Sequence, residues 1–253
     1  MVFGAAIELL QLAIDSGTPS VGDLIRNFIG CLVTLAFFVP SRKKVSKTSL
    51  RILQISVVII LILQVIPLAK SLIDEAIARE QFPVLSDFET PFEIARWSGG
   101  ARVSIDHKIA RHGKSSLKVR LTTDQYSGVG IKHFPCDWRG FDSLHFSVFN
   151  PSSTPLKTVC RVHDAIHYPN GGKYEDRFNM SFEVTQGWKD IIIPLENIAK
   201  APDNRKMDLS HIQGFGIHVV RLPKPEVIYI DYLRLMKQPE TDQHQSNLSP
   251  FSG

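Results

Sequence analysis

The chain has little cysteine: three residues in 253, which is too few for the disulfide framework of a small secreted protein. Its 16 glycines and 15 prolines are too sparse for a collagen-like repeat. A net charge of +4 is too small, at this length, to indicate nucleic-acid binding. No Ser-His-Asp context, glycine-rich phosphate loop or zinc-ligand spacing is present. With 43% hydrophobic residues, the chain as a whole is expected to fold.

Apolar runs dominate residues 1–73, whereas residues 84–236 have the pattern of a water-soluble β protein. The longest run, Ile52–Ala69, has no charged residue and is bracketed by Arg51 and Lys70. As a helix it would be about 27 Å long, close to the roughly 30 Å hydrocarbon core of a bilayer. We therefore expect a transmembrane helix here, with the two basic residues reaching the interfaces.

Two weaker apolar runs, Val2–Ile14 and Phe28–Val39, precede it, so residues 1–73 are predicted to form two to three transmembrane helices. The loop Ser41–Arg51 carries five basic residues and no acidic one. The positive-inside rule places this loop in the cytoplasm. Everything after Lys70 would then lie outside the cytoplasmic membrane.

A cluster of polar residues interrupts these apolar runs: Glu8, Gln11, Asp23, Arg26 and Asn27. Such residues are costly in a membrane and usually have partners. One hypothesis is an ion pair between Glu8 and Arg26. The other is that Asp23 caps a helix while Arg26 reaches the lipid headgroups.

The stretch GAAIELLQLAIDSGTPSVGDLIRNFIGCLVTL resembles the C-terminal half of VanZ-like membrane proteins. The positions that match that pattern are Glu8, Gln11, Ser20, Asp23, Asn27 and Gly30. The family's usual arginine in the turn is absent, because Thr18 follows Gly17, and its earlier membrane helices are missing. The chain is therefore either a truncated gene model or a degenerate unit. The resemblance implies a membrane protein of a family linked to glycopeptide resistance, with no established chemistry to carry over.

Residues 74–86 are predicted to link the membrane segment to the outer domain, with the helix continuing through Gln81 and ending before Pro83. Short alternating runs separated by glycine turns then predict an all-β jelly-roll sandwich over residues 84–236. Residues 237–253 are polar and are predicted to be a disordered tail. The expected strands are 116–121, 129–133, 144–149, 158–163, 177–183, 189–194, 214–220 and 227–235.

The motifs HGKSSLKVRL, GWKDIIIPLENI, MDLSHIQGFGIHV and VIYIDYLRL occur in this order along the outer segment. In order and spacing the segment resembles the galactose-binding-like sandwiches of carbohydrate-binding modules and of complex I intermediate-associated proteins. The resemblance implies the fold but not the role, since such sandwiches serve as sugar binders, assembly factors and accessory domains.

A structural Ca²⁺ is one candidate site, because such sandwiches often hold one where the first and last strands meet. Calcium needs six to eight oxygen ligands. Asp87 and Glu89 are expected on the first strand and Asp231 on the last, with the turn around Lys114 supplying carbonyl groups. The alternative is that these carboxylates cap strands or pair with Lys114.

The second candidate site is a groove for a sugar, which needs flat aromatic faces and planar polar groups. Residues 161–179 are rich in both, and the alternative is a long solvated loop. Trp138 and Trp188 are expected to be core or edge anchors, and a Cys136–Cys160 disulfide is chemically allowed. The predicted ligand-binding residues are Tyr126, His163, Asp164, His167, Tyr168, Tyr174, Asp176, Arg177 and Asn179.

These observations favour a bacterial membrane-anchored protein that binds an envelope or environmental glycan without cleaving it. A protein-interaction or assembly module that uses the same surface is the first alternative. The second is a glycosidase-like enzyme with Asp164 and Asp176 as its paired carboxylates.

Overall fold

The computed structural model describes residues 21–38 and 46–237. The chain divides into two compact units, Met1–Lys70 and Ser71–Gly253. The hypothetical Glu8–Arg26 ion pair and the expected disordered tail beyond Lys237 lie outside the described residues.

The first unit contains α2 (Val21–Phe37) and the larger part of α3 (Lys47–Gln81). Within the described residues, α3 is the one helix long and apolar enough to cross a membrane. For the described residues the prediction of two to three such helices is corrected to one, because α2 has 17 residues and its apolar part is limited to Asn27–Phe37. The predicted Val2–Ile14 helix lies outside the described residues. The Gln54 side-chain amide donates a hydrogen bond to the Ala36 carbonyl at 3.1 Å and connects the two helices.

The helix α3 continues to Gln81, two residues before Pro83, as the sequence predicted. The segment 74–86, which we expected to be a linker, consists of the end of α3 and the strand β1 (Val84–Ser86). Asp74 near the end of α3 forms a buried ion pair with Arg96 at 3.1 Å. This pair attaches the end of the helix to the sandwich.

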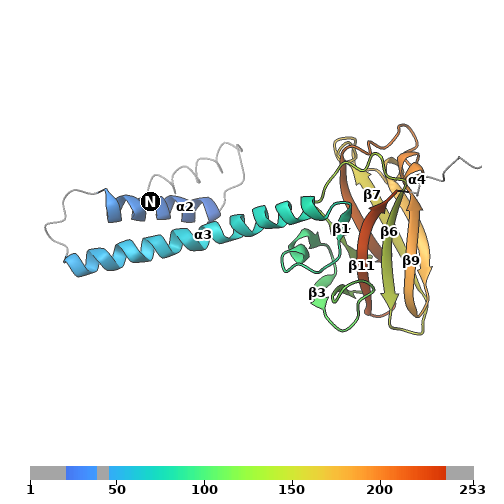
Figure 1. The fold of residues 1–253 in the computed structure, drawn as a ribbon, viewed down its shortest axis with the longest axis horizontal. Coiled ribbons are helices and arrows are strands. Elements are labelled where there is room, and N and C mark those ends of the chain that lie inside the picture. The colour runs from blue at the N-terminus through green and yellow to red at the C-terminus, as the bar shows by residue number, and fades with distance from the viewer. Residues whose placement is uncertain (1–20, 39–45, 238–253) are drawn as a thin grey trace, which may run out of the picture. The chain divides into compact units, whose positions relative to one another are not determined.

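The second unit is an all-β sandwich of two antiparallel sheets, as predicted. A six-stranded sheet has the order β3-β4-β11-β6-β9, with β1 also pairing with β11. A five-stranded sheet has the order β2-β5-β10-β7-β8. Figure 1 shows β11, β6 and β9 side by side, with β7 in the layer behind them. The strand bounds are β2 Trp97–Ser98, β3 Arg102–Asp106, β4 Ser116–Leu121, β5 Tyr126–Ile131, β6 Ser143–Asn150, β7 Leu156–Asp164, β8 Phe178–Val184, β9 Gly187–Pro194, β10 Ile212–Val220 and β11 Glu226–Met236.

Alternating side chains build the core between the sheets. In β4, Leu117, Val119 and Leu121 are at most 1% exposed, while the residues between them face outward. Trp138 is completely buried in this core, which confirms its expected anchoring role. Trp188 lies on the edge strand β9 and packs against Phe149, with ring centroids 5.2 Å apart.

The first and last strands pair with each other, since Val84 of β1 lies opposite Arg234 of β11. Asp87 and Glu89, which we expected on the first strand, instead follow it, because β1 ends at Ser86. The pairing of β11 with β6 is irregular between Asp231 and Arg234. This irregularity is a bulge in the strand that sits beside the predicted calcium residues.

Candidate functional site

The outer side of the five-stranded sheet collects aromatic and cationic residues from strands far apart in sequence. Arg161 of β7 lies between the core residues Cys160 and Val162, so its side chain is on the outer side. In register, Arg161 is opposite Gly216 of β10 on one side and Asn179 of β8 on the other. We call this surface the tyrosine–arginine face, which consists of Tyr126, Arg161, His163, Tyr168, Tyr174, Arg177, Asn179 and His218.

Two glycines of β10 give this face its shape. A Cβ atom on Gly214 would lie 2.3 Å from Cε1 of His163, and one on Gly216 would lie 3.3 Å from Nε of Arg161. The rings and guanidinium groups of β7 therefore lie directly over the backbone of the neighbouring strand. The sequence signal was two glycines alternating in a predicted strand, which marks a close approach, and our sequence analysis did not use it.

Three exposed tyrosines lie on this face. Tyr126, Tyr168 and Tyr174 are 62%, 57% and 61% exposed, respectively. The Tyr168 ring meets His163 edge to face at 5.1 Å, and the Arg177 guanidinium lies 5.5 Å from the centre of the Tyr174 ring. All three of these predicted ligand-binding tyrosines thus come to one surface and remain largely open to solvent.

Arg177 lies among these tyrosines, and all three interact electrostatically with its guanidinium group. Burial and the neighbouring charge of Arg161 lower the pKa of Arg177. Its Nε donates a hydrogen bond to Oδ1 of Asn179 at 3.1 Å, and the Asn179 amide donates in turn to the Tyr174 carbonyl at 3.0 Å. The Nε–H group of Arg177 is therefore bound to Asn179, while the N–H groups at the end of the guanidinium remain available to a ligand.

Two histidines of the face are held neutral. Burial, followed by the charge of Arg161, lowers the pKa of His163 to about 4. Burial and the charges of Arg161 and Arg177 also lower the pKa of His218, which our sequence analysis did not select. His167 contacts His163, with ring centroids 5.2 Å apart, so the pair that lies four apart in sequence does meet.

Asp164 and Asp176 were predicted ligand-binding residues, and the structure places both on one guanidinium group. Arg205 binds both oxygens of Asp164, at 2.5 and 2.9 Å, and both oxygens of Asp176, at 2.6 and 2.8 Å. Asp164 is completely buried, and Asp176 also accepts hydrogen bonds from Asn170 and His167. The hydrogen bonds from Arg205 lower the pKa of Asp176 strongly.

This carboxylate pair therefore stabilises the base of the loop between β7 and β8, next to the tyrosine–arginine face. Sequence reasoning missed Arg205, because it lies in an irregular segment 29 residues beyond Asp176 and no local pattern marks it.

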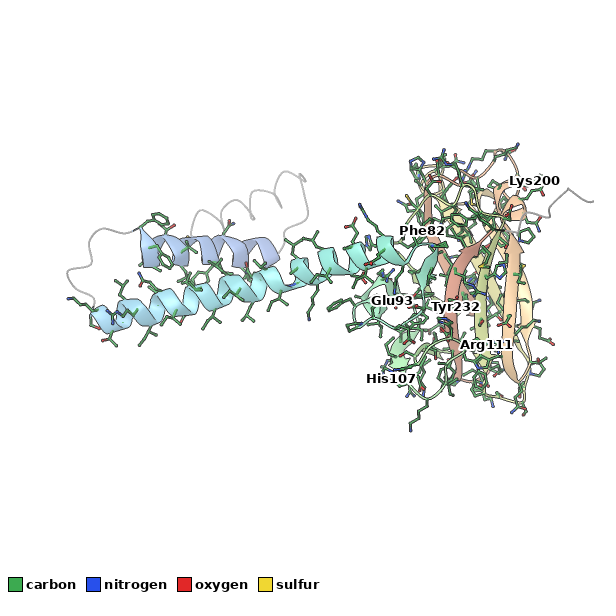
Figure 2. The ribbon with its side chains drawn as sticks, in the orientation of Figure 1. Phe82, Glu93, His107, Arg111, Lys200 and Tyr232 are labelled. Carbon is green, nitrogen blue, oxygen red and sulfur yellow. The ribbon has the colours of Figure 1, made fainter. Side chains whose placement is uncertain are left out.

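Two of the predicted calcium residues, Glu89 and Asp231, bind the backbone of the turn that precedes β4. Oε1 of Glu89 accepts hydrogen bonds from the backbone N–H groups of Lys114 and Ser115 at 2.7 and 2.8 Å. Oδ2 of Asp231 accepts from those of Arg111 and His112 at 2.6 and 2.9 Å. Figure 2 labels Arg111 of this turn and Tyr232, the residue that follows Asp231 in β11.

In this set, Asp231 has a buried oxygen, Oδ1, without a hydrogen bond. The turn thus presents N–H donors to the carboxylates where we expected carbonyl oxygens. Asp87 uses Oδ1 to accept from the Glu89 backbone N–H at 3.2 Å. Within residues 21–38 and 46–237, no three His, Cys, Asp or Glu side chains form a group able to hold a metal.

The cysteines of the sandwich are not joined. Cys136 is exposed, whereas Cys160 is completely buried in the core between β10 and β8. Burial raises the pKa of the Cys160 thiol far above its usual value. Among the described residues of this unit, Cys136 is therefore the thiol that is accessible to solvent.

Comparison with solved structures identifies the sandwich as a known fold. An exo-β-agarase matches 62% of this chain with 21% identity and a TM-score of 0.50, and the match spans 25% of the agarase. At this identity the likeness shows the fold alone.

Two smaller domains match at lower scores. The family 11 carbohydrate-binding module from Clostridium thermocellum, solved with a β-1,3-1,4-mixed-linked tetrasaccharide, matches 61% of this chain and 94% of its own at 20% identity, with a TM-score of 0.45. The CBM22-1 xylan-binding domain from Paenibacillus barcinonensis Xyn10C matches 62% and 96% at 18% identity, with a TM-score of 0.40. No protein-family model and no curated protein matches the chain, so the resemblance to VanZ-like proteins gains no support.

Proposed function

We propose that the sandwich binds a glycan on the tyrosine–arginine face and does not cleave it. The observation that carries the proposal is that three of the chain's five tyrosines, each more than half exposed, surround Arg177 on one face of one sheet. Exposed aromatic rings are costly for a domain that has a complete core of its own, and grouping them suggests a surface for recognition.

The chemistry of the face suits a pyranose ring. Tyrosine rings offer flat apolar surfaces to sugar C–H groups, and their hydroxyl groups stay polar at the rim. Arg177 and Asn179 offer planar donors and acceptors that can bind sugar hydroxyl groups between those rings. The glycines of β10 let the His163 ring and the Arg161 guanidinium lie close over the sheet, between the strands that carry the tyrosines.

We propose that the glycan is not cleaved because Asp164 and Asp176 are both bound to Arg205. Glycoside hydrolysis needs one carboxylic acid with a raised pKa to protonate the leaving group. Asp176 has a lowered pKa, and both Asp164 and Asp176 are bound by Arg205. This argues against the glycosidase-like alternative at these residues.

We also propose that α3 anchors the sandwich at the outer side of a bacterial cytoplasmic membrane. Most apolar side chains of this helix between Ile52 and Leu68 are exposed, as lipid contact would require. The basic residues between Ser41 and Arg51 favour a cytoplasmic position for that loop. In a Cys31→Ser background, a membrane-impermeant maleimide should label Cys136 in intact spheroplasts. Labelling only after permeabilisation would reverse this orientation.

The glycan proposal is tested by probing a polysaccharide microarray with the full chain in nonionic detergent. We expect a set of glycans to bind, and Tyr126→Ala or Tyr174→Ala to weaken binding about tenfold. Trp188→Ala removes an aromatic ring from the other sheet and should leave binding unchanged. A silent array, together with a protein captured through the same tyrosines, would replace the glycan with a protein partner.

A further inference from the structure

Two arginines on the tyrosine–arginine face lack an acidic partner. Among the residues that the structure describes, no carboxylate lies within 4.0 Å of Arg161 or Arg177. Arg177 has one side-chain hydrogen bond, to Asn179, which is neutral. Two guanidinium groups therefore share this surface with their charge uncompensated.

The nearest acids along the chain cannot supply that compensation. Asp164 ends β7 and Asp176 directly precedes Arg177, yet both carboxylates are bound by Arg205. Arg205 therefore binds two acids next to the face, whereas the two arginines on the face have no acidic partner.

The two charges act on the same surroundings. Arg161 and Arg177 both lower the pKa of His163 and of His218, and Arg161 lowers that of Arg177. The two histidines stay neutral partly because the arginines already make the face positive. Both arginines are half-buried, so solvent screens their charges less than it would on a fully exposed surface.

We propose that the glycan bound here is anionic, with a uronate carboxylate or a sulfate ester on the guanidinium groups of Arg161 and Arg177. This inference rests on the proposed glycan function and names its ligand class. Guanidinium groups bind such oxyanions through two parallel hydrogen bonds, and the surrounding tyrosines contact the sugar ring that carries the anion. A carboxylate and a sulfate ester present the same chemistry, so the experiment must distinguish them.

The test is affinity electrophoresis of the full chain in nonionic detergent, through gels that contain matched pairs of polymers. Polygalacturonate is compared with its methyl ester, and dextran sulfate with dextran, so each pair shares a backbone and differs in charge. We expect retardation by the charged member of at least one pair, and the pair that responds identifies uronate or sulfate. Arg161→Gln and Arg177→Gln should each weaken it about tenfold, since a charge-assisted hydrogen bond is lost.

Arg120→Gln is the matched control, because Arg120 is exposed on β4 of the other sheet and its loss changes the net charge equally. Equal weakening by Arg120→Gln would mean attraction by net charge alone and would overturn the inference. Equal retardation by both members of a pair, lost in Tyr174→Ala, would overturn the anionic ligand but support glycan binding. If no polymer retards the chain and the polysaccharide microarray is silent, both proposals fail.

Discussion

The guanidinium group of Arg205 binds the completely buried carboxylate of Asp164 through two hydrogen bonds, Nη1 to Oδ2 at 2.5 Å and Nη2 to Oδ1 at 2.9 Å. The backbone N–H of Asp208 donates a third bond to Oδ2 at 2.8 Å. A buried charge with this many partners is a structural element. The preceding residue of β7, His163, lies on the outer face.

Removal of Arg205 should destabilise the sandwich strongly. Arg205→Met leaves Asp164 charged, buried and without a counter-charge, which costs about 3 kcal/mol of unfolding free energy. Urea unfolding followed by tryptophan fluorescence measures this, because all three tryptophans lie in the sandwich. Arg139→Gln, which breaks the exposed pair with Asp137, should leave the midpoint unchanged. Equal effects of the two substitutions would contradict the assigned role of Arg205.

The free energy of unfolding should fall as the pH is lowered from 6.5 toward 4, because His163 is protonated in this range in the unfolded chain but not in the folded one. Its pKa is about 4 in the folded chain, against an ordinary value of 6.5. The unfolded chain therefore binds more protons between these values, so the contribution is complete above pH 6.5 and is lost as the pH falls toward 4. We expect a loss of about 1 to 2 kcal/mol between pH 7.5 and pH 5.

The same urea titrations, repeated across this pH range, check the assignment to His163. His163→Gln should flatten the pH dependence, whereas His133→Gln, at an exposed position, serves as the control. An unchanged slope in His163→Gln would show that other groups are responsible.

Because His163 packs closely against Gly214, a side chain at position 214 should destabilise the sandwich. In Gly214→Ala the new Cβ would lie 2.3 Å from Cε1 of His163, so the ring must leave its place. We expect a destabilisation of about 1 to 3 kcal/mol. The double variant Gly214→Ala/His163→Ala should recover part of it, because the clash is gone. Additive losses in this double-mutant cycle would mean that the two residues do not contact each other.

Calcium binding at Asp231 stays a prediction. One atom of the structure, Oδ1 of Asp231, supports it. Oδ1 of Asp231 is buried without a hydrogen bond, and burial raises the pKa of this carboxyl group. A bound Ca²⁺ would satisfy that oxygen and stabilise the folded chain by mass action. We expect millimolar Ca²⁺ to raise the thermal midpoint of the native chain, compared with EGTA, but not that of Asp231→Asn. Identical midpoints for the native chain would remove calcium from this site.

The sequence predicted the sandwich where its pattern was strict. The alternation over 116–121 is the full length of β4, because one side of that strand faces the core and the other faces water. The short strands β2 and β3 were missed, since two to five residues give too little periodicity.

The site was predictable in its composition but not in its charge arrangement. The tyrosines and Arg177 were selected because their types suit sugar binding, and they do lie together. Asp164 and Asp176 were selected for the same reason, yet both are bound by Arg205. That contact joins residues 29 and 41 positions apart, and only the folded chain brings them together.

Hydroxyl-radical footprinting of the tyrosines tests the central claim most directly. Three of the five tyrosines lie on the proposed face, and Tyr229 and Tyr232 lie on the other sheet. With the best-binding array glycan present, we predict reduced oxidation of Tyr126, Tyr168 and Tyr174 and unchanged oxidation of Tyr232, since Tyr229 is buried. Protection confined to Tyr232 would contradict the account and place the glycan on the opposite sheet.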